Sequence, residues 1–93
     1  MYRKEVTIVN PSGLHARPAA EFCKAASMFR SGVYILHNGR KINAKSIVNI
    51  LAGGILKGSR VTIEAEGPDE FIAVETLVAL VENGLGEANP GRP

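Results

Sequence analysis

His15 has the sequence neighbourhood best suited to chemistry in this chain of 93 residues, which has two histidines. It lies in residues 13–20 (GLHARPAA), where a helical pattern begins. The first amides of a helix lack acceptors and carry the positive end of the helix dipole, so they favour an anion. A neutral imidazole there can act as a nucleophile, and the Arg17 guanidinium presents a donor fork that fits phosphate oxygens. These residue types are compatible with a phosphoryl-accepting histidine, although from spacing alone a histidine near a helix start is more often an exposed residue or a modest cap.

A helix must follow His15 for this chemistry to be possible. The helical pattern runs from Ala16 to about Met28, and one apolar stripe along it is formed by Ala19, Phe22, Cys23 and Ala26. Pro18 then falls in the first turn, where its missing N–H breaks no intrahelical bond. The pattern therefore places His15 at or just before the helix start.

Four segments have the composition of strands. Residues 3–9 and 60–66 alternate in polarity, and residues 33–36 form a β-branched and aromatic run. Asn38-Gly39 is a strong hairpin signal, because a tight turn needs positive φ at both positions, and residues 40–43 form the returning strand. The polar residues of 60–66 predict a sheet that is open to water on one face.

Two more helices are expected in the second half of the chain. Ser46 is the predicted N-cap of a short helix from Ile47 to about Ala52. Asp69 is the predicted cap of a final helix, and Asn83-Gly84 can end it. The apolar stripe of that final helix is formed by Val74, Leu77, Val78 and Val81.

The element order is therefore βαββαβα, which predicts an α+β sandwich of two layers, an antiparallel sheet with helices on one face. The length allows one domain, which we place at residues 1–88. We expect the chain to fray from Glu87 onward and residues 89–93 to form a flexible tail.

Composition and charge exclude several classes of protein. The single cysteine, Cys23, excludes an internal disulfide and a cysteine zinc cluster, and no apolar run approaches the length of a membrane span. A reducing cytoplasm is the expected location. Residues 1–60 hold ten basic and two acidic residues, a formal charge of +8, whereas residues 61–93 hold one basic and seven acidic residues, a charge of −6. Such asymmetry predicts a basic face if the two halves do not interdigitate and cancel.

The segment Gly13–Ala19 resembles the active-site segment of HPr, the histidine-containing phosphocarrier family of the bacterial sugar phosphotransferase system. The resemblance extends over residues 3–86 and includes Asn38-Gly39, residues 44–47 (AKSI), residues 54–58 (GILKG) and residues 61–63 (VTI). It implies an open-faced β-sandwich, with a four-stranded antiparallel sheet in the order 1-4-2-3 and three helices on one side.

The resemblance also implies roles for the residues around His15. His15 would be the phosphohistidine, taking the phosphoryl group on Nδ1 from phospho-enzyme I and passing it to component A of a sugar-specific enzyme II. Arg17 would contact the phosphoryl oxygens, and the amides of Ala16 and Arg17 would add donors beside the rigid Pro18. The protein would be a phosphoryl carrier and not a stand-alone enzyme, with no cofactor and no metal.

A second set of roles falls on the short helix. Ser46 would be the site of regulatory phosphorylation by an ATP-dependent HPr kinase/phosphorylase, although Asn49 stands where the family frequently has glycine. Partners would dock on an apolar centre with a basic rim. The centre would be formed by Ile47, Val48 and Leu51, and the rim by Arg17, Lys24 and Lys45, with Arg40 or Lys41 as further candidates.

The residues alone leave several other functions open. Carriers of the nitrogen-related phosphotransferase branch look much like those of the sugar branch. A small nucleic-acid-binding module would suit the basic first sixty residues, but it normally presents stacking aromatic side chains, and only five residues are aromatic. A small phosphatase would need a second acid or base beside His15. We expect a monomer that does not bind nucleic acid or insert into membranes, and we expect His37 to be a surface residue.

Overall fold

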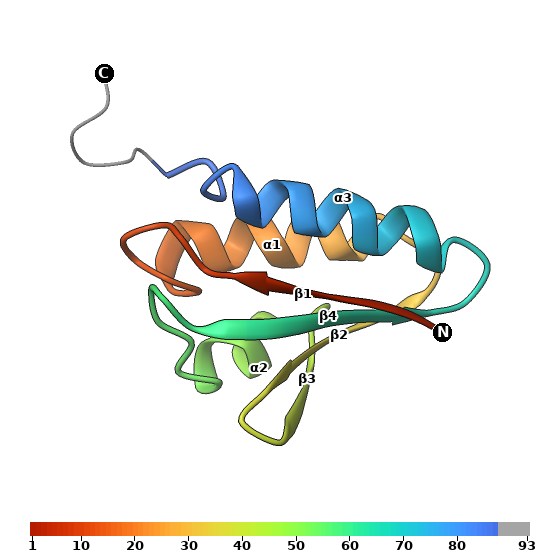
Figure 1. Ribbon diagram of the computed structural model, residues 1–93, viewed down its shortest axis with the longest axis horizontal. Helices are drawn as coiled ribbons and strands as arrows, with labels where there is room; N and C mark the ends of the chain where they lie inside the picture. Colours follow the sequence, from red (N-terminus) through yellow and green to blue (C-terminus); the bar gives the residue numbers. More distant parts are fainter. Residues whose placement is uncertain (88–93) are drawn as a thin grey trace.

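Four antiparallel strands in the order β1-β4-β2-β3 form a single sheet. They come from a computed structural model that describes residues 1–87 (Figure 1). The elements follow one another as β1 (Tyr2–Thr7), α1 (Ala16–Ser27), β2 (Gly32–His37), β3 (Arg40–Asn43), α2 (Ile47–Ala52), β4 (Arg60–Glu66) and α3 (Glu70–Glu82). The βαββαβα order and the implied strand order are confirmed. The expected tail, residues 89–93, lies outside the described residues.

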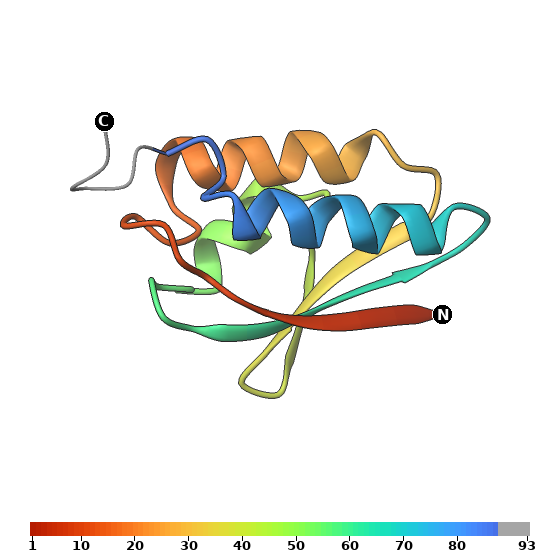
Figure 2. The same ribbon diagram turned by 45° about the horizontal axis from the view of Figure 1, so that its top comes forward.

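The helices lie on one side of the sheet and leave the other face open. Helix α3 packs on β1 and β4, and α1 packs against α2 and α3, so that α1 and α3 run side by side (Figures 1 and 2). The apolar stripes predicted for both long helices enter the core, except that Cys23 is only half-buried. None of the helices within residues 1–87 is long and apolar enough to cross a bilayer.

The hairpin between β2 and β3 forms where the sequence predicts it. Asn38 and Gly39 have φ angles of 50° and 76°, the left-handed geometry that a two-residue hairpin requires. Ser46 caps α2 as expected, because its Oγ accepts a hydrogen bond from the Asn49 amide at 3.3 Å.

The prediction that the Asp69 side chain caps α3 is wrong. Asp69 occupies the N-cap position of α3, but its carboxylate makes no cap hydrogen bond. It accepts hydrogen bonds from the amides of Arg30 and Ser31, each at 2.9 Å, and from the Ser31 hydroxyl. Asp69 therefore joins the end of the α1–β2 connection to the start of α3.

The open face is less solvated than its sequence predicts. Glu64, on β4, is only 3% exposed, because Arg3 and Lys41 cover its carboxylate at 3.6 and 3.3 Å. The Lys41 ammonium also lies 4.4 Å from the centre of the Tyr34 ring. An ion-paired cluster therefore covers the middle of this face.

The expected fraying at Glu87 is also wrong. Leu85 is fully buried, and the Glu87 carboxylate accepts hydrogen bonds from the Ser12 amide at 2.8 Å, the Ser12 hydroxyl and Asn10 Nδ2 at 3.0 Å. The segment after α3 therefore returns to the loop that precedes His15.

Candidate functional site

His15 lies at the start of α1, as its sequence predicts. It is the N-cap residue, with an extended backbone (φ −131°, ψ 162°), and its half-buried side chain makes no capping hydrogen bond. The chain before it is held firmly, since Leu14 is buried and its amide donates to the Ile55 carbonyl at 3.0 Å. The imidazole therefore stands on a fixed backbone without serving as a cap.

Gly13 allows the loop to approach residues 55 and 56 closely. Its φ is 64°, and a Cβ at this position would lie 2.5 Å from the Ile55 carbonyl oxygen. Any larger residue would push the loop away, so the placement of His15 depends on this glycine.

The residue after His15 has a strained backbone. Ala16 has φ 52°, a left-handed conformation that costs a non-glycine residue about 1–2 kcal/mol. Within residues 1–87, the amides of Ala16 and Arg17 have no hydrogen-bond acceptor. Two donors at the positive end of the α1 dipole are therefore available to an anion on His15.

Arg17 adds a cation beside these amides. Its side chain is exposed and makes no ion pair within residues 1–87. Arg17 and Pro18 line a cavity of about 330 Å³ together with Leu85, Gly86 and Glu87. An anion entering this cavity would meet a guanidinium that no carboxylate of residues 1–87 neutralises.

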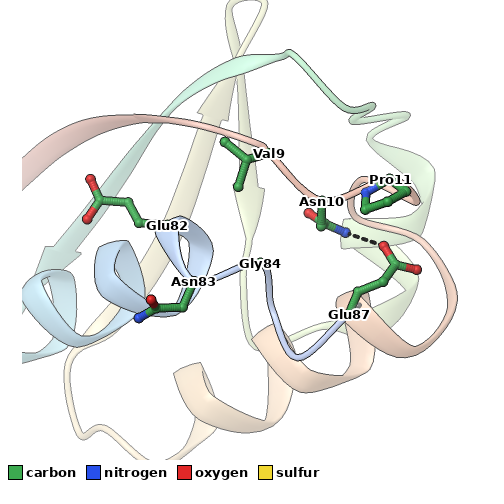
Figure 3. A pocket seen from close by; sticks show the side chains of 7 residues that line it. All are labelled: Val9, Asn10, Pro11, Glu82, Asn83, Gly84 and Glu87. Carbon is green, nitrogen blue, oxygen red and sulfur yellow. Dashed lines mark hydrogen bonds between the residues drawn. The ribbon is translucent and has the colours of Figure 1, made fainter. Parts of the chain in front are cut away.

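Glu87 is a neighbour of the site that sequence reasoning missed. Its hydrogen bonds from the Ser12 hydroxyl, the Ser12 amide and Asn10 hold the pKa of the Glu87 carboxyl below its usual range. Figure 3 shows the bond between Asn10 and Glu87. No local signal could have revealed this contact, because Ser12 and Glu87 are 75 positions apart in the chain.

The predicted docking residues gather on α2 and beside it. Val48 is 70% exposed, and Ile47 and Leu51 are 37% and 41% exposed, so the helix presents an apolar surface. Lys24 is exposed on α1, whereas Lys45 is half-buried with its ammonium donating to the Phe29 carbonyl at 2.7 Å.

The basic rim is narrower than the sequence predicts. Lys41 lies on the open face with Glu64 and does not join the rim. Within residues 1–87, the side-chain cations that pair with carboxylates are Arg3, Lys4, Lys41 and Arg60, and the ammonium of Met1 pairs with Glu70. Within residues 1–87, the cations without an ion pair include Arg17 and Lys24 on α1, Arg40 at the hairpin and Lys45 before α2. The two charged halves of the chain therefore cancel in part, and the remaining positive charge includes Arg17, two positions after His15.

A family model described as the PTS HPr component phosphorylation site matches residues 2–83. The chain belongs to the HPr family. Phosphocarrier protein HPr of Vibrio cholerae is 46% identical over 82 residues, covering 88% of this chain and 96% of that protein. HPr proteins are phosphocarriers, and membership gives this chain the same general role.

Solved structures of HPr proteins have the same fold. The crystal structure of HPr-C-His from Thermoanaerobacter tengcongensis has a TM-score of 0.92 at 43% identity, covering 96% of this chain and all of that one. A second structure from that organism, described as an HPr dimer, has a TM-score of 0.75 at 44% identity, covering 94% of this chain and all of that one. The open-faced sandwich that the sequence implies is therefore the family fold.

Proposed function

We propose that this protein accepts a phosphoryl group on His15 from phospho-enzyme I and donates it to component A of a sugar-specific enzyme II. The observation that carries the proposal is the position of His15 at the start of α1, where, within residues 1–87, the next two amides have no acceptor and Arg17 makes no ion pair. Within residues 1–87, no group of three His, Cys, Asp or Glu side chains is arranged to hold a metal ion. The proposed chemistry uses neither a metal nor a cofactor.

The transfer is a substitution at phosphorus. The lone pair of His15 Nδ1, with the ring proton on Nε2, attacks the phosphorus of phospho-enzyme I. A P–N bond forms as the bond to the donor breaks, and the donor keeps that electron pair. The amides of Ala16 and Arg17 and the Arg17 guanidinium would stabilise the charge on the phosphoryl oxygens, since positioning and electrostatics supply most of the catalysis in phosphoryl transfer. The reverse sequence, with an acceptor on component A, releases the phosphoryl group.

We propose that both partners bind the apolar surface of α2. Val48 and its neighbours Ile47 and Leu51 provide the centre, and Arg17 and Lys24 provide exposed positive charge beside it. A small apolar centre with a charged rim supports fast, weak complexes, which a shuttle between several partners needs.

Ser46 is the proposed regulatory site, a substrate for an HPr kinase/phosphorylase. A phosphate there would lie at the start of α2, beside the apolar surface, and add negative charge where partners dock. Incubation with such a kinase and ATP should label the protein but not its Ser46→Ala variant. Equal labelling of both proteins, or none of either, would remove Ser46 from this role.

The direct experiment uses phosphoenolpyruvate and enzyme I. We expect an acid-labile, base-stable phosphate on the protein, lost in His15→Ala and kept in His37→Ala, which is a matched control because it removes the other histidine. Label that survives His15→Ala would exclude the proposal. Comparing the enzyme I of the sugar branch with that of the nitrogen-related branch would identify the branch; we favour the sugar branch.

A nucleic-acid module is not favoured by the open face of the sheet. The Tyr34 ring is covered by the Lys41 ammonium, and Arg3, Lys41 and Arg60 are all paired with carboxylates. As far as residues 1–87 form it, this face offers neither a free stacking platform nor unpaired cations, which single-stranded nucleic acid requires.

We propose that the carrier acts as a monomer in the cytoplasm, where it would meet enzyme I. An HPr of Thermoanaerobacter tengcongensis has been solved as a dimer. Sedimentation at working concentration should give the mass of one chain, and a stable mass of two chains would contradict this part of the proposal.

A further inference from the structure

The segment after α3 brings Glu87 back to the loop before His15. Gly84, Leu85 and Gly86 have φ angles of 86°, 55° and 76°, so three consecutive left-handed residues turn the chain. This conformation is strained for Leu85, which is fully buried in the core. The Glu87 amide donates to the Gly84 carbonyl at 2.9 Å. Because a strained backbone persists only where its surroundings hold it, the core fixes the place of Glu87.

The carboxylate of Glu87 meets three donors of that loop. Its Oε1 accepts from the Ser12 amide at 2.8 Å and from Asn10 Nδ2 at 3.0 Å, and its Oε2 accepts from the Ser12 hydroxyl. Hydrogen bonds to an ionised carboxylate are stronger than those between neutral groups. The family model ends at residue 83, so this contact lies outside the segment that it matches.

Asn10 extends this network toward His15. The buried Asn10 side chain also donates from Nδ2 to the Gly13 carbonyl at 2.9 Å, and the Gly13 amide donates back to the Asn10 carbonyl at 3.2 Å. Figure 3 shows the Asn10 amide turned toward the Glu87 carboxylate. On the other side of His15, Ala16 has the strained φ of 52°. The backbone that carries the imidazole is therefore held from the carboxyl end of the described chain.

We propose that Glu87 is a positioning residue for phosphoryl transfer, whose carboxylate holds the loop of residues 10–14 and thereby aims the His15 ring at an incoming phosphoryl group. This role rests on the proposed function of His15. Both carboxylate oxygens of Glu87 are taken by loop donors, so the residue acts through the loop and not as an acid or a base. Misplacement of a reacting group by about 1 Å can slow a reaction roughly 100-fold. The loss should therefore fall on the rate of transfer and not on docking at α2.

Glu87→Ala removes the three contacts and keeps the buried Leu85. It should lower kcat for phosphorylation by phospho-enzyme I about tenfold and change KM less than about twofold. Glu87→Gln should restore most of the rate, because its amide oxygen can accept from the Ser12 amide and Asn10, and its NH₂ can donate to the Ser12 hydroxyl. An unchanged kcat in Glu87→Ala would overturn the proposal, and so would an equal loss in Glu87→Gln.

Glu82→Ala is the matched control, because it removes the same charge at the end of α3. Glu82 is exposed and makes no ion pair within residues 1–87. The control should keep the kcat of the parent protein. A loss as large as that of Glu87→Ala would show a general effect of charge and exclude the positioning role.

NMR spectroscopy separates this role from the proposed function, since it needs no enzyme I. In Glu87→Ala, the Ser12 amide should exchange faster with solvent and the His15 ring signals should shift, while the His37 ring signals stay in place. If the His15 ring signals do not shift, the positioning role is excluded and the phosphoryl-accepting role of His15 is unaffected. If enzyme I does not label His15 in the parent protein, the proposed function itself fails, and the positioning role fails with it.

Discussion

At the scale of residues, the neighbourhood of His15 is assembled from groups that are each left without a partner. The Ala16 and Arg17 amides lack acceptors within residues 1–87, and the Arg17 guanidinium lacks a carboxylate there. Glu87 is close enough to line the cavity beside Arg17, but its carboxylate is occupied by Ser12 and Asn10. The donors therefore stay available for a phosphoryl group.

Replacing Arg17 tests the most specific of these donors. Arg17→Ala should slow both phosphorylation by enzyme I and transfer onward, by roughly 10- to 100-fold, because one charge-stabilising donor is lost. The stability should change by less than about 0.5 kcal/mol, since the side chain is exposed and makes no ion pair within residues 1–87. Rapid-quench kinetics and urea unfolding measure the two effects. Unchanged rates in both directions would show that Arg17 has no part in transfer.

The features that the sequence reveals depend on residues that are close together in the chain. Most of the features that it does not reveal depend on residues that are far apart in the chain. The His15 segment, the Asn38-Gly39 hairpin and the Ser46 cap are local, and each was predicted from a few neighbouring residues. Glu87 and Lys41 were mispredicted, because their partners, Ser12 and Glu64, lie far away in the chain. The left-handed Ala16 was also missed, since nothing in the residue type requires a positive φ.

At the scale of elements, Asp69 joins the two long helices at the end opposite His15. Its three hydrogen bonds reach the connection that follows α1, while the residue itself starts α3. Bonds from the Ser31 hydroxyl and the Arg30 amide lower the pKa of Asp69 from 3.8 to about 2. The ionised carboxylate is therefore the form that the fold stabilises.

Ionisation of Asp69 should make the free energy of unfolding depend on pH in the acid range. Because the pKa of Asp69 is lower in the folded state, its contribution is fully present above about pH 3.8 and is lost as the pH falls through about 2. Asp69→Asn should lower the stability at neutral pH and flatten this part of the acid transition. Urea unfolding over a pH series measures it. The pKa values of Glu70, Glu75 and Glu87 are lowered as well, so some acid dependence should remain.

If Asp69→Asn has the same acid transition as the parent protein, the Ser31 contact does not govern the pH dependence. Glu66→Gln is the matched control, since Glu66 is exposed and its carboxylate makes no hydrogen bond or ion pair within residues 1–87. It should leave the transition unchanged.

At the scale of the whole molecule, some of the cations pair with carboxylates and others do not. The cations of the strands β1 and β4, and Lys41 of β3, meet carboxylates, whereas Arg17, Lys24 and Arg40 do not within residues 1–87. The small formal charge of +2 therefore hides a region of unpaired positive charge near α1 and α2. Such a region steers an acidic partner toward His15 without requiring a highly charged protein.

Two charge reversals of equal size separate steering from net charge. Lys24→Glu and Arg60→Glu both change the formal charge by the same amount, but Lys24, on α1, makes no ion pair within residues 1–87, whereas Arg60 is paired with Glu5 on the open face. If steering acts through the α1 and α2 surface, Lys24→Glu should lower the association rate with enzyme I about tenfold at low ionic strength, and salt should remove the difference. Arg60→Glu should have little effect. Stopped-flow association at several salt concentrations measures both, and equal losses in the two variants would mean that only the net charge matters.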